Sequence, residues 1–186
     1  MNLPNTITAG RLVLTAVFVV AVSVGGTWGY FVGLWSFVFA AISDFLDGYL
    51  ARKLGQVTST GKLMDPLADK VLVAAAYVFL VSVNLCPAWV AIVILAREFL
   101  VTGLRQIAVE QGMVLAADRL GKWKTGFQIA YCITGMVWLI ELDWNYLRPL
   151  AQPDQVLLPV FLWGSLLMTV LSGGNYLKKS RELFRG

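Results

Sequence analysis

Four aspartates lie close together in a chain that is otherwise strongly apolar: Asp44, Asp47, Asp65 and Asp69. Hydrophobic residues make up 58% of the chain and its mean hydropathy is +0.72, so most of its length suits a bilayer. A charged side chain at the centre of a membrane helix costs about 2.5–3.5 kcal/mol, and intramembrane acids therefore mark a functional site by default. Because clustered carboxylates repel one another, we expect a bound cation among them.

The first pair of aspartates lies on a helical face with room for a large ligand. Asp44, Asp47, Gly48 and Ala51 follow one another at positions i, i+3, i+4 and i+7, so they share one face of a helix. Two carboxylates on this face are followed by two positions with almost no side chain. The face can therefore bind a metal ion and still admit a bulky group. If the helix starts near Tyr30, Asp44 lies about 21 Å along it, which approaches headgroup depth.

The second pair, Asp65 and Asp69, is spaced i and i+4 and also shares a helical face. Pro66 suits a first turn, so we expect this helix to begin near residue 65. The chain contains no histidine, and carboxylates without His or Cys select hard divalent ions, Mg²⁺ or Mn²⁺. Two such ions can hold a diphosphate and stabilise both the entering and the leaving oxygen. Arg52, one turn beyond Gly48, can reach the same diphosphate.

Two other interpretations of the aspartates remain open. In the simpler one, the acids only form ion pairs with nearby basic side chains, namely Arg52, Lys53, Lys62 and Lys70. That interpretation requires no particular spacing and leaves the small residues unexplained. In the other, the protein is a divalent-cation transporter, which would place its acids near the middle of the membrane and often contains internal repeats. We find no such repeat in the sequence.

Eight positions match, without a gap or substitution, the signature of the CDP-alcohol phosphotransferase family: Asp44, Asp47, Gly48, Ala51, Arg52, Gly61, Asp65 and Asp69. The chain thus resembles enzymes with six transmembrane helices that transfer a phosphatidyl or related group from a CDP-linked donor to an alcohol and release CMP. The resemblance implies metal ligands at Asp44, Asp47, Asp65 and Asp69, a base for the acceptor hydroxyl at Asp69, and contacts to the CDP group from Gly48 and Arg52.

The amino-terminal segment carries a weaker resemblance to the same family. Members tend to open with a stretch like Asn2-Leu3-Pro4-Asn5 followed by Thr8 and Arg11. The resemblance implies that Asn5 and Thr8 help to hold the cytidine end of the donor. Both residues can equally be helix caps. The resemblance also implies a homodimer, a state for which an apolar surface in lipid gives no independent signal.

Basic residues in the second half of the chain predict a phosphate pocket. Arg97 and Arg105 are eight residues apart, about 80° around a helix, so both can point into one cavity. Lys122 and Lys124 point about 200° apart, so we expect only one of them to face that cavity. Arginine forks and lysine charges suit a dianion; the alternative is snorkelling of these side chains to lipid phosphate. Tyr176 is a further pocket candidate, or equally an interfacial tyrosine.

A phosphate pocket favours a phosphorylated acceptor over a neutral alcohol. Together with the segment from Asp65 to Lys70, it makes the chain most similar to family members that use CDP-diacylglycerol and glycerol 3-phosphate and form phosphatidylglycerophosphate and CMP. Inositol phosphate or phosphatidylglycerol as the acceptor is the nearest alternative, because the aspartate motif defines the donor chemistry and says little about the alcohol. We expect membrane lipid as a partner and expect no nucleic acid.

The elements that must position these residues are predicted to be helices. Apolar windows of about twenty residues, the length that a bilayer requires, lie at 6–25, 30–52, 65–84, 87–109, 123–142 and 155–177. The predicted fold is all-α, an integral membrane bundle of six transmembrane helices in a single domain, residues 1–186. Cys86 and Cys132 lie in or beside apolar runs and are interpreted as packing residues.

Positive charge predicts the orientation of this bundle. Lys and Arg are concentrated in the 53–64 link, the 110–122 link and the carboxyl-terminal tail, whereas the links at 26–29, 85–86 and 143–154 are poor in them. By the positive-inside rule, we expect both termini and the aspartate motif to lie on the cytoplasmic side of the cell membrane. The first positive side chain is Arg11, so the start of the chain lacks the basic region of a secretory signal and should be retained as a first helix.

Overall fold

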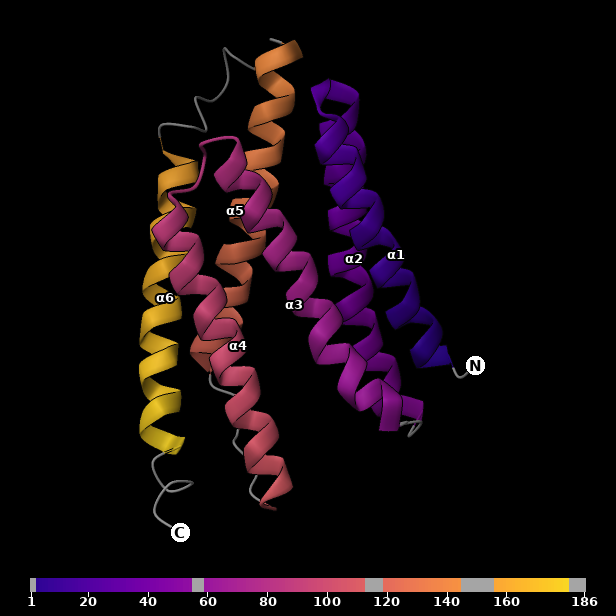
Figure 1. Ribbon diagram of the computed structural model, residues 1–186, viewed down its shortest axis with the longest axis vertical. Coiled ribbons are helices and arrows are strands. Elements are labelled where there is room, and N and C mark those ends of the chain that lie inside the picture. The colour runs from indigo at the N-terminus through magenta and orange to yellow at the C-terminus, as the bar shows by residue number, and fades with distance from the viewer. Residues whose placement is uncertain (1–2, 55–58, 113–118, 145–155, 181–186) are drawn as a thin grey trace.

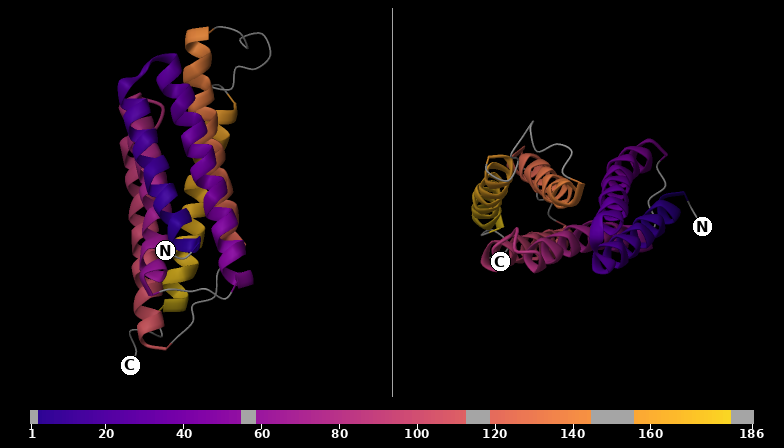
Figure 2. Two further views of the ribbon diagram at one scale, coloured as in Figure 1. Left: turned by 90° about the vertical axis from the view of Figure 1, so that its right-hand side faces the viewer. Right: turned by 90° about the horizontal axis from the view of Figure 1, so that it is seen from above.

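The computed structural model is a bundle of six helices (Figures 1 and 2) and describes residues 3–54, 59–112, 119–144 and 156–180. Within these ranges, side chains are described except at 3–7, 45–67, 69, 119, 141–144 and 179. The helices are α1 Leu3–Val24, α2 Gly26–Leu54, α3 Ser59–Ser82, α4 Ala88–Glu110, α5 Arg119–Trp144 and α6 Leu157–Lys179. The described ranges contain no strand, which confirms the prediction of an all-α fold with six helices.

Helix α2 begins earlier than the sequence predicted. Gly25 and Gly26 adopt φ values of 72° and 71°, a left-handed conformation that glycine reaches without steric cost. Two such glycines reverse the chain at once, so the predicted link at 26–29 was wrong and forms the first turn of α2. Asp44 consequently lies about 27 Å along the helix, at about 1.5 Å per residue, instead of the shorter distance expected from a start near Tyr30.

Helix α3 also begins earlier than predicted. It starts at Ser59, so Pro66 lies beyond its first turn, and the expected start near residue 65 was wrong. Lys62, Leu63 and Met64 all favour the helical conformation, and they extend the helix ahead of the proline. An interior proline removes one backbone hydrogen bond and can kink a helix, but here it does not end it.

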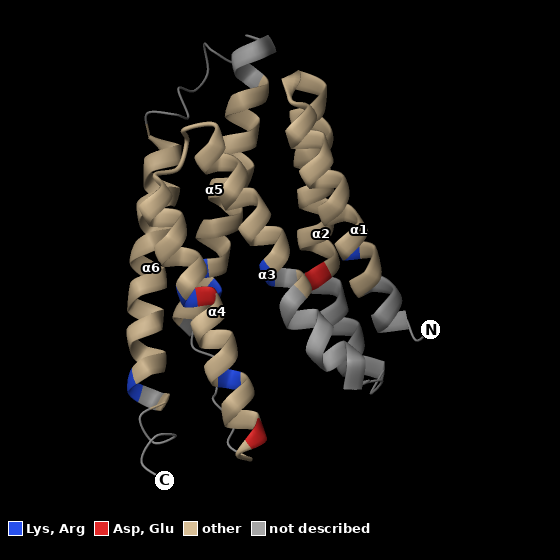
Figure 3. Ribbon diagram, in the orientation of Figure 1, with Lys and Arg blue, Asp and Glu red and all other residues tan. Residues whose placement is uncertain are grey.

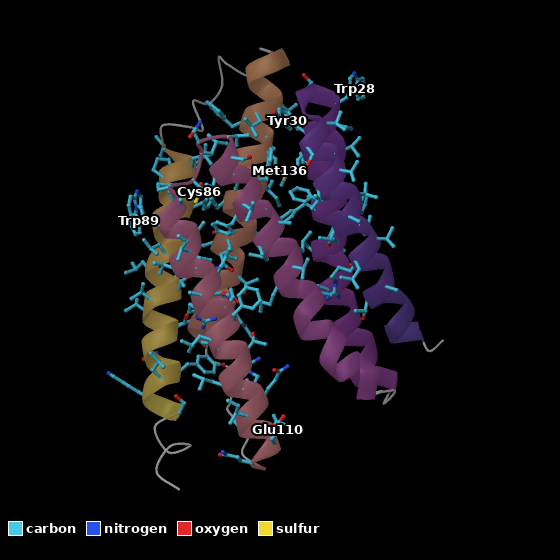
Figure 4. The ribbon with its side chains drawn as sticks, in the orientation of Figure 1. Trp28, Tyr30, Cys86, Trp89, Glu110 and Met136 are labelled. Atoms are coloured by element: carbon cyan, nitrogen blue, oxygen red, sulfur yellow. The ribbon has the colours of Figure 1, made fainter. Side chains whose placement is uncertain are left out.

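Large apolar side chains cover the outside of the bundle as well as filling its core. Trp28 and Trp89 point outward, whereas Cys86 and Met136 are buried (Figure 4). In the part of the chain that the structure describes, two helical segments are long and apolar enough to cross a membrane, Gly26–Asp44 and Leu157–Lys178. Both cysteines are free and packed in the core, as predicted. The helices fit a membrane protein.

Charge divides the bundle into two halves. Every Lys, Arg, Asp and Glu whose side chain the structure describes lies between the middle of the bundle and its lower end in the view of Figure 3, the end where α1 begins and α6 ends. The other half is packed by aromatic and aliphatic side chains, with Phe18 against Phe37 (ring centroids 5.9 Å apart) and Phe79 (6.3 Å). Some charged residues on α4 and α5 are buried inside the bundle. The mean hydropathy of these two helices therefore understates how apolar their outer faces are.

Candidate active site

The end of α2 and the start of α3 place the aspartates in two matched pairs. Only the link between Leu54 and Ser59 separates the two helices, so these ends are neighbours (Figure 1). At about 1.5 Å per residue, Asp44 and Asp69 each lie about 15 Å along their helices from that link. The same rise puts Asp47 about 10 Å and Asp65 about 9 Å from it. The antiparallel hairpin therefore gives each aspartate of α2 a counterpart at a similar height on α3.

Asp44 forms an ion pair with α1. Its Oδ1 lies 2.7 Å from Nη1 of Arg11, whose side chain is 1% exposed, whereas the Asp44 side chain is 48% exposed. Thr15 donates its hydroxyl to the carbonyl of Arg11 at 2.8 Å. Thr8 is buried one turn before Arg11 and lies within α1, so the alternative that it caps the helix was wrong. A charged and polar face of α1 thus supports Asp44 while leaving about half of that carboxylate accessible.

The remaining donor-side predictions rest on helix position alone. Six of the predicted residues lie on α1, α2 or α3, with side chains outside those that the structure describes: Asn5, Asp47, Gly48, Arg52, Asp65 and Asp69. Asn5 falls in the first turn of α1. Their proposed contacts to metal ions and to the donor stay predictions.

A second charged group, the basic cluster, consists of Lys70, Arg97, Glu98 and Lys124. Glu98 is 3% exposed and lies at its centre: Oε2 is 3.2 Å from Nζ of Lys70, and Oε1 is 3.4 Å from Nη1 of Arg97. The buried Lys124 donates from Nζ to the same Oε1. The cluster brings together α3, α4 and α5, and its described side chains contain three cations for one carboxylate.

Helix α6 holds the two arginines of α4. Arg97 donates from Nη2 to the Ser172 hydroxyl at 2.9 Å, and Arg105 donates from Nη2 to the Tyr176 hydroxyl at 2.7 Å. The two guanidinium carbons lie 5.7 and 5.6 Å from the centroid of the Tyr176 ring, within the range of a cation–π interaction. A Cβ at Gly173 would approach Cγ of Arg97 to 3.2 Å. Arg97 and Arg105 therefore share one side of α4, and both face the buried ring of Tyr176 on α6.

The two lysines at the start of α5 have different environments. Lys124 is buried against Glu98, whereas Lys122 is exposed. Their different directions follow from the helical geometry that the sequence predicted. Within the described side chains, only Lys124 of this pair belongs to the basic cluster.

Sequence reasoning gave no role to Glu98 or Ser172. Glu98 carried a signal, because an acid on an apolar helix marks a functional position by default. Ser172 carried none, since a serine on a membrane helix is unremarkable until its partner is known. Lys70 was considered as a counterion for the aspartates; in the structure it also forms an ion pair with Glu98. Lys70 directly follows Asp69, so the basic cluster borders the aspartate motif on α3.

This arrangement can attract a multiply charged anion. Within the described side chains the cluster has an excess of positive charge, and Nε of Arg97 is buried without a hydrogen-bond partner. Arginine and lysine side chains so arranged suit phosphate oxygens. A phosphate held here would lie beside the helix that carries Asp65 and Asp69.

Known proteins match the chain over nearly its whole length. The family model described as CDP-alcohol phosphatidyltransferase matches residues 1–171. A CDP-diacylglycerol–glycerol-3-phosphate 3-phosphatidyltransferase of Bacillus subtilis is 39% identical, over 99% of this chain and 97% of its own. The protein of the same name from Rickettsia felis is 33% identical, over 98% and 97%, and that from Pseudomonas fluorescens is 42% identical over 66% and 64%. The chain belongs to the CDP-alcohol phosphatidyltransferase family and is a transferase.

Proposed function

We propose that this transferase moves a phosphatidyl group from CDP-diacylglycerol to glycerol 3-phosphate, giving phosphatidylglycerophosphate and CMP. The basic cluster carries the proposal, because three cations around one buried carboxylate suit a phosphorylated acceptor better than a neutral one. Relatives at 33–39% identity over nearly the full chain are named for this reaction. Lys122 and Arg105 would supply further positive charge at the cytoplasmic edge of the cluster.

The family is generally dependent on divalent metal ions, and the aspartates of this chain fit that requirement. The donor set consists of carboxylates, which suit Mg²⁺ or Mn²⁺, and the accessible carboxylate of Asp44 has space for a ligand. Asp44, Asp47, Asp65 and Asp69 would hold two ions. When bound, the ions would stabilise negative charge on the diphosphate of the donor and on the departing CMP.

The protein's own residues would carry out the remaining steps. Gly48 and Arg52, with Asn5 and Thr8, would orient the CDP group, and the basic cluster would hold the acceptor phosphate. Asp69 would take the proton from the primary hydroxyl of glycerol 3-phosphate. The hydroxyl oxygen then bonds to the lipid-bearing phosphorus, the bond from that phosphorus to the oxygen of CMP breaks, and CMP leaves with the electron pair.

We also propose that all six helices cross the cell membrane, as one domain with both termini and the active site on the cytoplasmic side. Two observations support this topology: the Lys and Arg side chains that the structure describes lie between the middle of the bundle and the end where α1 begins, and its outer surface carries many large apolar side chains. By family resemblance the protein would be a homodimer. Cysteine labelling from each side of intact cells would test the topology, and the mass of the protein in detergent would test the dimer.

Release of CMP by the purified protein tests the proposed activity. With CDP-diacylglycerol and Mg²⁺, glycerol 3-phosphate should support CMP release, whereas inositol phosphate and phosphatidylglycerol should not. Chelation of the metal should abolish turnover. If only another acceptor works, the acceptor assignment is wrong; if reconstituted protein moves Mn²⁺ across vesicles without a CDP-lipid, the protein is a transporter.

The variant Asp69→Asn separates the proposed base from a metal ligand. Loss of a general base lowers turnover by about 10²–10⁴-fold. We expect such a loss with Mn²⁺ binding retained, as measured by electron paramagnetic resonance. Full activity in Asp69→Asn would exclude the base role.

A further inference from the structure

Gln128 is a buried amide without a hydrogen-bond partner for its NH₂ group. Its side chain is 2% exposed, and Nε2 has no partner among the residues that the structure describes. An unpaired buried donor is costly, and such groups are uncommon in native structures. An unmet donor at this position therefore points to a partner that is absent from the protein itself.

Gln128 lies between the basic cluster and the apolar core. On the same face of α5, Lys124 is one turn toward the helix start and contacts Glu98 of α4. One turn the other way, Tyr131 packs against Tyr77 of α3, with ring centroids 5.7 Å apart. Since both neighbours face the interior formed by α3 and α4, the buried Gln128 faces it too. It therefore lies directly next to the basic cluster, on the side farther from the cytoplasmic end.

The polar groups near this level do not supply the missing acceptor. Thr169 on α6 is fully buried and donates its hydroxyl to the carbonyl of Ser165 at 2.6 Å, and within the described residues no hydrogen bond joins it to Gln128. In the basic cluster, the Glu98 carboxylate is occupied by three cations. Nε of Arg97 is likewise buried without a partner in the described part of the chain. A ligand that extends from the basic cluster to Gln128 could bring oxygen acceptors to both of these N–H groups.

Arg97 is a charged donor and Gln128 is a neutral one. This difference suggests which part of such a ligand each of them binds. Charged donors bind phosphate oxygens more strongly than a neutral amide does, so Arg97 and Lys124 take the phosphate of the acceptor. Gln128 lies about 6 Å beyond Lys124 along α5, a separation comparable with the length of a three-carbon acceptor. A neutral amide there suits a neutral hydroxyl oxygen.

We propose that Nε2 of Gln128 donates a hydrogen bond to the secondary hydroxyl of glycerol 3-phosphate. Gln128 is then a specificity-determining residue, which selects an acceptor that carries a hydroxyl on the carbon between its phosphate and its reacting end. This inference rests on the proposed function, and it adds a contact that the aspartates and the basic cluster do not make.

The test compares two acceptors in two proteins. Glycerol 3-phosphate carries the secondary hydroxyl, and 3-hydroxypropyl phosphate lacks it. In the unmodified protein, kcat/KM should favour glycerol 3-phosphate by about three- to tenfold, the worth of one neutral hydrogen bond. In Gln128→Met, which keeps the length of the side chain and removes the donor, this ratio should fall to about one, because only the rate with glycerol 3-phosphate decreases.

Stability and a matched control distinguish recognition from a structural role. Removing an unpaired buried amide costs no hydrogen bond, so the unfolding temperature of Gln128→Met in detergent should be unchanged or raised. Gln111→Met makes the same change at an exposed position at the end of α4, and should leave the acceptor ratio as it was. If Gln128→Met misfolds, Gln128→Leu provides the same comparison.

Two results would overturn the inference. The unmodified protein uses both acceptors equally well, or Gln128→Met retains the preference for glycerol 3-phosphate. A retained preference with both acceptors slowed by the same factor is the result expected if Gln128 binds a structural water. If the unmodified protein turns over neither acceptor, the proposed function itself fails, so the two failures are distinguishable.

Discussion

Asp44 and Glu98 are two carboxylates with opposite environments. Asp44 lies toward the end of α2, is 48% exposed and pairs with Arg11 at 2.7 Å. Glu98 lies in the middle of α4, is buried and pairs with cations from α3, α4 and α5. The difference teaches that an accessible carboxylate retains the capacity to bind a further cation, whereas an enclosed one serves to hold other side chains in place. Asp44 should therefore matter most for activity and Glu98 for stability.

The largest effect is expected from Asp44→Asn. Loss of a metal ligand should lower turnover by about 100-fold or more, because a bound metal supplies several kcal/mol of transition-state stabilisation. The unfolding temperature should change little, since a partly exposed ion pair contributes about 0–1 kcal/mol. CMP release and thermal unfolding in detergent measure the two quantities. Near-normal turnover in this variant would remove Asp44 from the metal site.

Glu98→Gln should have the opposite profile. The substitution leaves three cations without their carboxylate, and breaking a buried ion pair costs about 3–5 kcal/mol. We expect a clear decrease in the unfolding temperature, larger than for Asp44→Asn. The control is Glu110→Gln, which makes the same change at the exposed end of α4. Equal unfolding temperatures for the two variants would show that Glu98 does not hold the cluster together.

Lys124→Met and Lys122→Met test the basic cluster with two changes of identical chemistry. A hydrogen bond from a charged group is worth about 1.5–3 kcal/mol, so Lys124→Met should raise KM for glycerol 3-phosphate by about tenfold or more. Lys122 is exposed, and its substitution should change KM by no more than about twofold. KM for CDP-diacylglycerol should stay constant in both. Similar effects of the two substitutions would contradict an acceptor site centred on Lys124.

Tyr176→Phe should have the smallest effect. It removes the hydroxyl that accepts a hydrogen bond from Arg105 and keeps the ring that both arginines face. Because Arg105 is largely exposed, we expect KM for glycerol 3-phosphate to rise by only about threefold, the lower end for one hydrogen bond. Tyr176→Leu, which also removes the ring, should raise it further. An effect of Tyr176→Phe as large as that of Lys124→Met would show that Arg105 is the main phosphate ligand.

The helices and the aspartate motif could be predicted because their signals are local. Apolar windows give the number of helices, and spacing places Asp44 and Asp47 on one face. The start of α2 could not be placed, because the sequence does not state that Gly25 and Gly26 both adopt positive φ. Glu98 shows a different limit: its partners come from three helices, and the rotation of one helix against another depends on packing over the whole bundle.

Asp69, the proposed base, and Lys70, a member of the basic cluster, are adjacent in the sequence. This adjacency links deprotonation of the acceptor to the binding of its phosphate. The two residues are neighbours on α3, about 1.5 Å apart along the axis and about 100° apart around it. Lys70 is tied to the basic cluster through Glu98. The spacing between the proposed base and the group that holds the acceptor phosphate is thus set partly by one peptide unit. Small shifts of the helices in membranes of different thickness would move both together, so the alignment of the acceptor would tolerate such shifts.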